Sequence, residues 1–400
     1  MLLASCSRGV ISSPLPIDST KSSYAGAPPS VGSFQVLYSF KRGGGGSVPE
    51  GFLVDVKGML YGTTGVGSGS CAGCGAVFAV STSGKEHLVH AFTGGSDGGF
   101  PGYGGLLYYG GKLYGTTIGG GLNRGGTIFQ LSTSGNVQVL YSFKRSNENP
   151  NASLLAIKTM LYGTTYAGGG GGCSGCGTAF EFGPVGFQTL YQFKGYPHDG
   201  ENPYGPVIAV GGTLYGTTSG GGNGYGCARS GSGCGTAFAL STSGKERVLH
   251  NFRGGRSDGA YPTGALLNLN GTLYGVTRNG GNSGYGTVFS VTIGGKERVL
   301  HRFTGGSDGA YPAGGLTAVN GTLYGTTLAG GAQCAPSGRC GTVFAVDKSG
   351  SERILYRFRG GKDGGYPGGG LLAVDGMLYG TTSRGGTGCP SCGTVFRISP

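Results

Sequence analysis

The sequence predicts an all-β protein built as a seven-bladed β-propeller of four-stranded antiparallel blades. The pentapeptide Leu-Tyr-Gly-Thr-Thr occurs seven times, one copy reading Leu-Tyr-Gly-Val-Thr. The spacing runs from 48 residues (Tyr114 to Tyr162) to 59 residues (Tyr215 to Tyr274), which is typical of a propeller blade and too long for leucine-rich or ankyrin units. Two aromatic-bearing segments also occur seven times each, so no unit is missing. The tyrosines of the motif are Tyr61, Tyr114, Tyr162, Tyr215, Tyr274, Tyr324 and Tyr379.

Each unit is predicted to hold four strands, which we call A to D in chain order. In the unit at 309–358, strand A is expected over 315–319 and strand B over 322–327. Asn320-Gly321 lies between them, and Asn-Gly indicates a two-residue hairpin because both turn positions need positive φ. Strand C is expected over 341–346 and strand D over 352–358. Short strands rich in β-branched and aromatic residues, each ended by turn residues, favour an antiparallel meander.

The C and D strands supply the two other landmarks. Strand C holds Phe78, Phe129, Phe180, Phe238, Phe289, Phe344 and Phe396. Strand D ends at Phe40, Phe92, Phe143, Phe193, Phe252, Phe303 and Phe358. The repeated pentapeptide itself is predicted to pack blade against blade; the alternative, that it binds a ligand, stays open.

The two ends of the chain predict how the ring closes. The first recognisable strand, 34–40, is a D strand, and the last, 393–399, is a C strand. We expect these strands to pair and complete the seventh blade, which would remove two exposed sheet edges. The predicted domains are an N-terminal anchor or linker, residues 1–33, and the propeller, residues 34–400.

The N-terminal segment contains a possible lipidation site. Leu3-Ala4-Ser5-Cys6 resembles the lipobox of bacterial lipoproteins, in which the cysteine is lipidated, but only five residues precede Cys6. A secretory signal needs a charged start and an apolar stretch of about 7–15 residues. Either the true start lies upstream or the match is chance. No apolar run approaches the roughly 18 residues of a membrane span, so membrane contact is expected only through Cys6.

Composition limits the classes of partner. Glycine makes up 94 of 400 residues without a collagen period, and the net charge of +12 is spread over all repeats. We therefore expect no nucleic-acid binding, although a mild attraction to anionic polymers is consistent with the charge. A monomer is expected.

The cysteines predict disulfides and an oxidising compartment. Apart from Cys6 they form five pairs between strands B and C: Cys71 with Cys74, Cys173 with Cys176, Cys227 with Cys234, Cys334 with Cys340, and Cys389 with Cys392. The second and fifth units lack both members, as expected of disulfides. Two alternatives stay open. Zinc would need four ligands at one point, and a redox-active pair of the thioredoxin type would need a βαβ context. We expect no metal and no cofactor.

A recurrent loop between strand D and the next strand A supplies the candidate ligand-binding residues. They are Asp97, Asp199, Asp258, Asp308, Asp363, Tyr261, Tyr311 and Tyr366. The D–A and B–C loops should emerge on one face and the tight turns on the other, and sites favour loops on a rigid scaffold. Carboxylates beside aromatic rings suit sugars or cations. The alternative is structural, because Asp-Gly and Tyr-Pro are turn formers.

No catalytic constellation is present. His90, His250 and His301 occupy the D-strand position that Tyr38, Tyr141, Tyr191 and Tyr356 fill elsewhere, which predicts packing. We therefore assign no catalytic residue.

The repeated LYGTT, the Gly-rich loop, the GTVF strand and the VLxxF strand resemble the GloVer tandem repeat of bacterial secreted and surface proteins. The resemblance covers about residues 34–400 and implies an extracytoplasmic protein with no established activity. Some members carry a C-terminal sorting signal; this chain ends at its last strand, so an anchor is expected only at Cys6. The pattern is also similar to quinoprotein-like and kelch-like propellers, but with no Trp and no adjacent Cys-Cys it supports the fold and not quinone chemistry.

These observations favour a secreted or lipid-anchored, disulfide-stapled module that binds a glycan or a protein. One alternative is a carbohydrate-active enzyme, a lyase or hydrolase, with its site on the long-loop face. Such an enzyme should bring together residues that depart from the repeat in one central cluster. A second alternative is a purely architectural surface protein.

Overall fold

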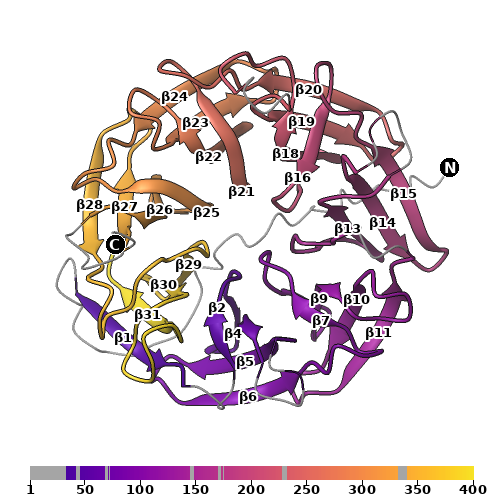
Figure 1. Ribbon diagram of the computed structural model, residues 1–400, viewed down its shortest axis with the longest axis vertical. Helices are drawn as coiled ribbons and strands as arrows, with labels where there is room; N and C mark the ends of the chain where they lie inside the picture. The colour runs from indigo at the N-terminus through magenta and orange to yellow at the C-terminus, as the bar shows by residue number, and fades with distance from the viewer. Residues whose placement is uncertain are drawn as a thin grey trace, which may run out of the picture.

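The computed structural model describes residues 33–41, 46–67, 71, 73–144, 148–169, 173, 175–227, 232–331 and 340–400. These residues form 31 strands and no helix, arranged as seven antiparallel sheets around one axis (Figure 1). The predicted fold class is confirmed. The proposed anchor segment, including Cys6, lies outside the described residues.

The strands alternate in direction within each blade, from A next to the axis to D at the rim. The A strands are β3 (Val54–Val56), β8 (Leu107–Tyr109), β12 (Leu155–Ile157), β17 (Ile208–Val210), β21 (Gly259–Leu269), β25 (Ala310–Val319) and β29 (Leu372–Val374). The B strands are β4 (Met59–Val66), β9 (Lys112–Gly119), β13 (Met160–Thr165), β18 (Thr213–Gly221), β22 (Thr272–Gly280), β26 (Thr322–Ala329) and β30 (Met377–Thr382).

The outer two strands complete each blade. The C strands are β5 (Ala76–Ser81), β10 (Thr127–Leu131), β14 (Thr178–Gly183), β19 (Thr236–Ser241), β23 (Thr287–Thr292), β27 (Thr342–Val346) and β31 (Thr394–Ile398). The D strands are β1 (Phe34–Ser39), β6 (Glu86–Ala91), β11 (Val137–Ser142), β15 (Gly186–Gln192), β20 (Glu246–Asn251), β24 (Glu297–Arg302) and β28 (Glu352–Arg357). We number the blades 1 to 7 by their B strands, so that β4 is in blade 1 and β30 in blade 7.

The A strands are longer than the sequence predicts. In blades 5 and 6 they begin at Gly259 and Ala310, so the Tyr-Pro of the predicted loop lies inside β21 and β25. In blades 1, 2 and 4 the same stretch forms a separate short strand on strand B: β2 (Ser47–Pro49), β7 (Gly99–Pro101) and β16 (Gly200–Pro203). The register shifts between Thr263 and Leu267, where the chain bends toward the axis. The prediction that these tyrosines lie in a loop is therefore wrong. The strand continues through the glycine-containing stretch by means of a β-bulge, where a turn was expected.

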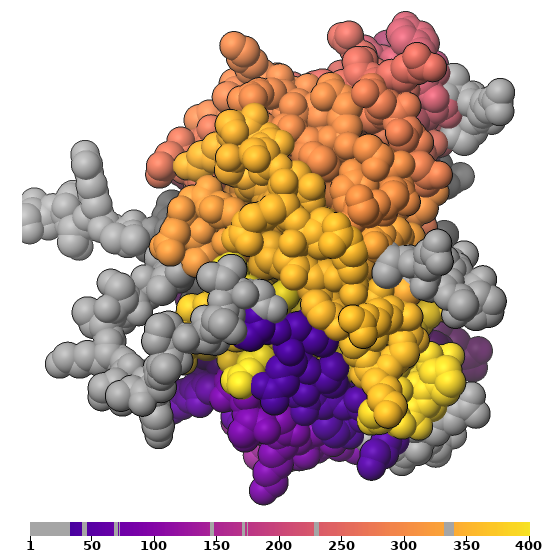
Figure 2. Space-filling model, turned by 90° about the vertical axis from the view of Figure 1, so that its left-hand side faces the viewer, coloured from indigo at the N-terminus to yellow at the C-terminus, as the bar shows by residue number. Residues whose placement is uncertain are grey.

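The ring closes through the predicted pair of strands. β1 lies antiparallel to β31, with Phe34 opposite Ile398 and Ser39 opposite Thr394. The Phe40 N–H also donates to the Gly393 carbonyl at 3.0 Å. The indigo surface of the N-terminal strand adjoins the yellow surface of the C-terminal residues in the space-filling view (Figure 2). Closure therefore joins the two ends of the chain within blade 7.

The repeated pentapeptide is a packing motif. Its glycine lies opposite the C-strand phenylalanine, as Gly325 lies opposite Phe344, and a Cβ built at Gly325 would be 2.5 Å from Phe344 Cζ. Its last threonine pairs with the first threonine of strand C, as between Thr327 and Thr342 with hydroxyls 2.9 Å apart. Its first threonine reaches the next blade, where Thr326 donates to the Gly369 carbonyl at 3.1 Å. The motif is therefore used in packing, mostly within its own blade, and Thr326 provides the contact between blades. The close approach at the glycine is made by a phenyl ring.

The two faces of the ring differ as predicted. The A–B turns are tight: Asn320 and Gly321 have φ of 50° and 81°, as a type I′ turn requires. The opposite face carries the B–C and D–A loops, which are joined across blades by a bond such as that from Tyr311 N–H to the Tyr285 carbonyl at 2.8 Å. We call this side the long-loop face.

Candidate functional site

The five predicted aspartates are held by their own loops. Each accepts bonds from backbone N–H groups of the D–A loop, as Asp258 does from Arg253 at 2.8 Å and Gly259 at 2.6 Å. Each also contacts a residue of the preceding D strand or loop. The partners are His90 for Asp97, Tyr191 for Asp199, His250 for Asp258, His301 and Thr304 for Asp308, and Tyr356 for Asp363. The structure does not bring these aspartates together, since they lie on different blades.

The three predicted tyrosines share a backbone role. Tyr261, Tyr311 and Tyr366 have φ of 54°, 57° and 59°, and the equivalent residues of the other blades also have positive φ. Those equivalents are Val48, Phe100, Asn149 and Asn202. The positive φ at this position is therefore sevenfold even where the loop sequence is not. A ligand-binding role for these loops stays a prediction.

One loop carboxyl group does face a second carboxyl group across a blade boundary. Glu246, the first residue of β20, lies near Asp199, whose carboxylate accepts a bond from the Tyr191 hydroxyl at 2.8 Å. Burial, with the Asp199 charge nearby, raises the pKa of Glu246 to about 7, and its Oε1 is buried without a hydrogen-bond partner among the described residues. Folding is therefore favoured by a protonated Glu246.

Substitution Glu246→Gln is expected to stabilise the protein at pH 8 and to change little at pH 5. A raised folded-state pKa contributes stability that is complete below the unfolded value of 4.5 and is lost as the pH rises through about 7. Because the side chain is only half-buried, we expect a gain of about 1 kcal/mol at pH 8. Urea unfolding at both pH values, with a chelator present, measures the difference in free energy of unfolding between the variant and the unaltered protein. An equal difference at both pH values would contradict the raised pKa of Glu246.

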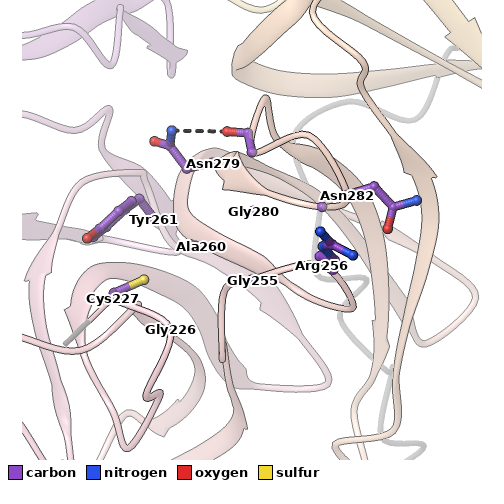
Figure 3. A pocket seen from close by; sticks show the side chains of 11 residues that line it. Gly226, Cys227, Gly255, Arg256, Ala260, Tyr261, Asn279, Gly280 and Asn282 are labelled. Atoms are coloured by element: carbon purple, nitrogen blue, oxygen red, sulfur yellow. Dashed lines mark hydrogen bonds between the residues drawn. The ribbon is translucent and has the colours of Figure 1, made fainter. Parts of the chain in front are cut away.

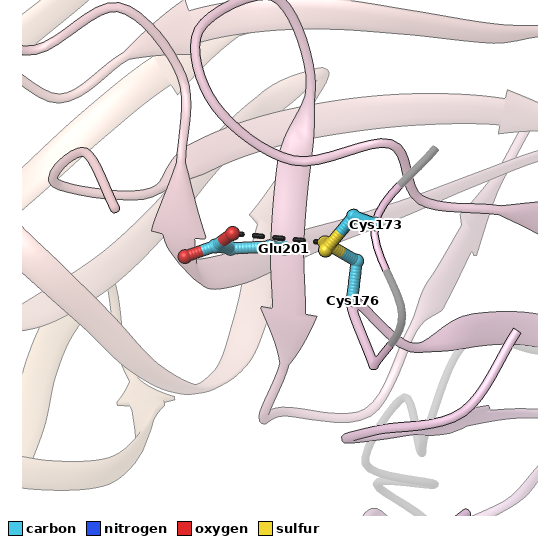
Figure 4. A group of neighbouring side chains, drawn as sticks. All are labelled: Cys173, Cys176 and Glu201. Atoms are coloured by element: carbon cyan, nitrogen blue, oxygen red, sulfur yellow. Dashed lines mark hydrogen bonds between the residues drawn. A yellow bond between two sulfur atoms is a disulfide. The ribbon is translucent and has the colours of Figure 1, made fainter. Parts of the chain in front are cut away.

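The cysteines form local disulfides in the described residues. Four bonds join Cys71 to Cys74, Cys173 to Cys176, Cys227 to Cys234, and Cys389 to Cys392. Cys340 is also disulfide-bonded, whereas Cys334, its predicted partner, lies outside the described residues. Glu201 lies beside one bond, with Cys176 Sγ 3.6 Å from Oε2 (Figure 4). These bonds indicate an oxidising, extracytoplasmic environment.

A cavity of about 620 Å³ lies on the long-loop face between blades 4 and 5. Arg256, Tyr261, Asn279, Asn282 and Cys227 contribute side chains to its lining (Figure 3). Asn279 Nδ2 donates to the Gly284 carbonyl at 3.3 Å, which holds its amide against the loop. Of the predicted ligand-binding residues, Tyr261 lines this cavity, and of the predicted disulfide cysteines, Cys227 does.

A different group of residues meets at the axis of the long-loop face. In each blade the A strand bends inward just after its proline, and the residues there are Glu50, Tyr103, Asn151, Tyr204, Thr263, Ala313 and Gly368 in blades 1 to 7. The rings of Tyr103 and Tyr204 are 6.2 Å apart and near parallel, although their blades are not neighbours. Tyr166, at the end of β13, meets the Tyr204 ring edge-on at 6.1 Å. Because blade 3 lies between blades 2 and 4, side chains from these two blades can meet only near the axis of the ring.

Polar groups surround these rings. The Tyr103 N–H donates to Asn151 Oδ1 at 3.2 Å, and Asn151 is buried. Burial raises the pKa of Glu50 to about 7, and no hydrogen-bond partner of Glu50 is present among the described residues. Burial, the neighbouring Tyr103 and the Glu50 charge raise the pKa of Tyr204 to about 12, while the exposed Arg278 opposes them. We call Glu50, Tyr103, Asn151, Tyr166, Tyr204 and Arg278 the axial cluster.

The axial cluster breaks the sevenfold pattern. Tyr103 occupies an extra residue between proline and leucine, because four residues separate Pro101 from Leu106 where three separate Pro312 from Leu316. Blades 5 to 7 place only Thr, Ala and Gly at the inward bend. Sequence reasoning missed these residues because it followed what repeats. Alignment of the seven units would have exposed them as departures.

Within the described residues, membrane-spanning helices are not found. A family model described as the Gloeobacter/Verrucomicrobia repeat matches residues 26–174, 68–228, 149–340 and 221–400. Comparison with curated protein sequences finds no match.

Three solved structures are similar in fold. A provisionally assigned 6-phosphogluconolactonase from Bacteroides uniformis has 11% identity and a TM-score of 0.48, over 76% of this chain and 83% of that chain. A protein of unknown function from Bacteroides thetaiotaomicron has 11% identity and a TM-score of 0.42, over 94% and 99%. A luciferin-regenerating enzyme has 13% identity and a TM-score of 0.41, over 89% and 92%. Likeness at this level says nothing of the activity of this chain.

Proposed function

The chain belongs to the Gloeobacter/Verrucomicrobia repeat family, and from that premise we propose that it is an extracytoplasmic module that binds a glycan at its axial cluster. The proposed location is the cell exterior, by secretion or by a lipid at Cys6. The observation that carries the proposal is the contact of Tyr204 with Tyr103 and Tyr166 from two other blades. These rings depart from the repeat, so the packing of the propeller does not account for them.

The chemistry of the cluster suits a sugar. Tyrosine rings offer flat apolar faces with a polar edge, and such rings commonly pack against the C–H faces of pyranose units. Asn151 and Glu50 add an amide and a carboxyl group that match sugar hydroxyls. Arg278 is exposed beside Tyr204, and the net charge is +12, which favours an acidic glycan such as one containing uronate. A protein ligand is the second choice, because a stable protein interface buries a much larger surface than the axial cluster offers.

Substitution Tyr204→Ala is expected to weaken glycan binding by at least tenfold. Loss of one stacked aromatic contact costs about 0.5–1.5 kcal/mol in addition to the lost buried area, and a tenfold change corresponds to about 1.4 kcal/mol. A glycan array followed by titration calorimetry on the best oligosaccharide measures it. Tyr225→Ala is the matched control, because Tyr225 is 82% exposed and lies away from the axis. Equal binding by the two variants, or no binding to any acidic or neutral glycan, would rule out the proposal.

The axial cluster also meets the condition set for an enzyme, because its residues depart from the repeat and lie together at the centre of the ring. This favours a second candidate, a uronate lyase. Glu50 is a single carboxyl group in the axial cluster, whereas glycoside hydrolysis by the usual mechanism needs two. With a pKa of about 7, Glu50 is suited to act as the base that removes the proton from the carbon bearing the uronate carboxylate. As this proton leaves, the neighbouring C–O bond breaks, and a tyrosine hydroxyl protonates the leaving oxygen. Turnover would then rise as the pH passes through 7. Glu50→Gln would abolish the unsaturated product and retain binding; binding without product in the unaltered protein supports the module.

A further inference from the structure

Three clusters of one design lie at blade boundaries on the outer part of the ring. Each joins the loop aspartate, a D-strand residue of the same blade and the first glutamate of the next D strand. The members are Tyr191, Asp199 and Glu246; His250, Asp258 and Glu297; and His301, Asp308 and Glu352. The second and third clusters carry histidine where the first carries tyrosine. They are separate from the axial cluster.

The geometry of the second cluster is that of three potential ligands around one point. Nε2 of His250 lies 3.1 Å from Oδ2 of Asp258, and the ligand atoms of His250, Asp258 and Glu297 all lie within 4.8 Å of one another. Backbone N–H groups orient the aspartate, and the His250 ring meets Phe252 edge-on at 4.8 Å, which fixes its plane. Oε1 of Glu297 is buried and has no hydrogen-bond partner among the described residues.

The third cluster is more open, since the ligand atoms of His301, Asp308 and Glu352 do not form a group within 4.8 Å of one another. Nε2 of His301 lies 3.6 Å from Oδ2 of Asp308, too long for a hydrogen bond. Both this nitrogen and Oε1 of Glu352 are buried without a hydrogen-bond partner among the described residues. A buried polar atom without such a partner is costly, and in the second cluster Oε1 of Glu297 is one. Arg302 lies near Glu297, but its Nη2 donates to the Ser257 carbonyl at 2.9 Å.

We propose that the second cluster, His250, Asp258 and Glu297, binds one divalent transition-metal ion of the zinc class. One imidazole nitrogen and two carboxylate oxygens form a mixed N/O set that suits Zn²⁺ and is less suited to Ca²⁺, which takes oxygen ligands. Three protein ligands leave a fourth position for water. The side chains of His250 and Asp258 are 17% and 9% exposed, so an ion can enter from the surface. Because the ligands come from two neighbouring blades, the ion would tie blade 4 to blade 5.

The chain supplies its own controls. His90 contacts Asp97 at 3.3 Å, but the next D strand begins with Val137, so the second carboxylate is missing. The first cluster keeps both carboxylates and has Tyr191 in place of histidine. His→Tyr is therefore a substitution that this fold already accommodates at the same place.

The test is titration of the full chain with zinc chloride alone, after removal of metals with a chelator and alkylation of free thiols. The expected result is one bound equivalent and a rise in the thermal midpoint. His250→Tyr should lose the site, with affinity at least tenfold weaker, and His90→Tyr should keep it. Glu297→Gln, which preserves side-chain volume, should also lose it.

Calcium chloride is the comparison and should give at least tenfold weaker binding. Absence of zinc binding in the unaltered chain would overturn the proposal, as would equal binding by the His250→Tyr variant. A thermal midpoint that responds to pH and not to zinc would also overturn it, because the cluster would then share a proton instead of an ion.

Discussion

Removal of residues 1–40, and with them β1, is expected to abolish cooperative folding of the entire ring. The deletion exposes the full edge of β31, which β1 covers from Phe34 to Ser39. It also removes Phe40, which is fully buried and contacts Phe78 of blade 1 edge-on at 4.9 Å. Loss of one buried phenylalanine costs about 3–5 kcal/mol, and the total stability of a domain is about 5–15 kcal/mol. Near-ultraviolet circular dichroism and urea unfolding measure the result.

The matched control for this deletion is removal of residues 1–32, which leaves β1 in place. That shorter truncation should leave the unfolding midpoint unchanged. A peptide of residues 33–41 added to the longer truncation should restore part of the native signal, because the strand binds by edge pairing. Native-like unfolding of the chain that lacks residues 1–40 would show that closure through β1 is unimportant.

Replacement of Phe344 by alanine is expected to destabilise the protein by about 3–5 kcal/mol, the usual cost of emptying a buried aromatic site. The side chain is fully buried, touches Phe303 edge-on at 5.1 Å and covers Gly325. Gly325→Ala should cost about 1–3 kcal/mol by overpacking, because its Cβ would meet the Phe344 ring.

The double variant tests the reason for both effects. With Phe344 removed, the added Cβ no longer meets the phenyl ring. The double variant should therefore lose less stability than the sum of the two single losses, by about 1 kcal/mol or more. Denaturant unfolding of the four proteins, with disulfides intact, gives the coupling energy. Strict additivity would contradict the assignment of the motif glycine to accommodation of the phenyl ring.

The features that repeat were predictable from the sequence. Blade number, strand order, closure by residues 34–40, and the cysteine pairs all follow from patterns present in most units. The positive φ at Tyr261, Tyr311 and Tyr366 was not predicted, because positive φ at a non-glycine residue has no sequence signature when Val48 and Phe100 adopt it too. The A strands also extend further than predicted. The Gly- and Pro-containing stretch before them, which the composition indicated to be a loop, pairs with strand B.

The axial cluster could not be predicted from the repeated loops. Its members come from six positions on five blades, and only the ring geometry brings Tyr103 to Tyr204. The loop aspartates were predicted as ligand-binding residues because they recur. Their recurrence reflects hydrogen bonds within the loop, such as that from the Thr304 N–H to Asp308 at 2.8 Å. In this chain the repeated residues stabilise the scaffold, and the departures from the repeat carry the candidate site.

The most direct test of this view is a crystal structure with an acidic oligosaccharide bound. Density for the sugar should lie on the axis of the long-loop face, against the rings of Tyr103 and Tyr204 and within reach of Glu50 and Arg278. Density confined to the D–A loops around Asp258 or Asp308, or to the cavity lined by Arg256 and Asn282, with nothing on the axis, would contradict it.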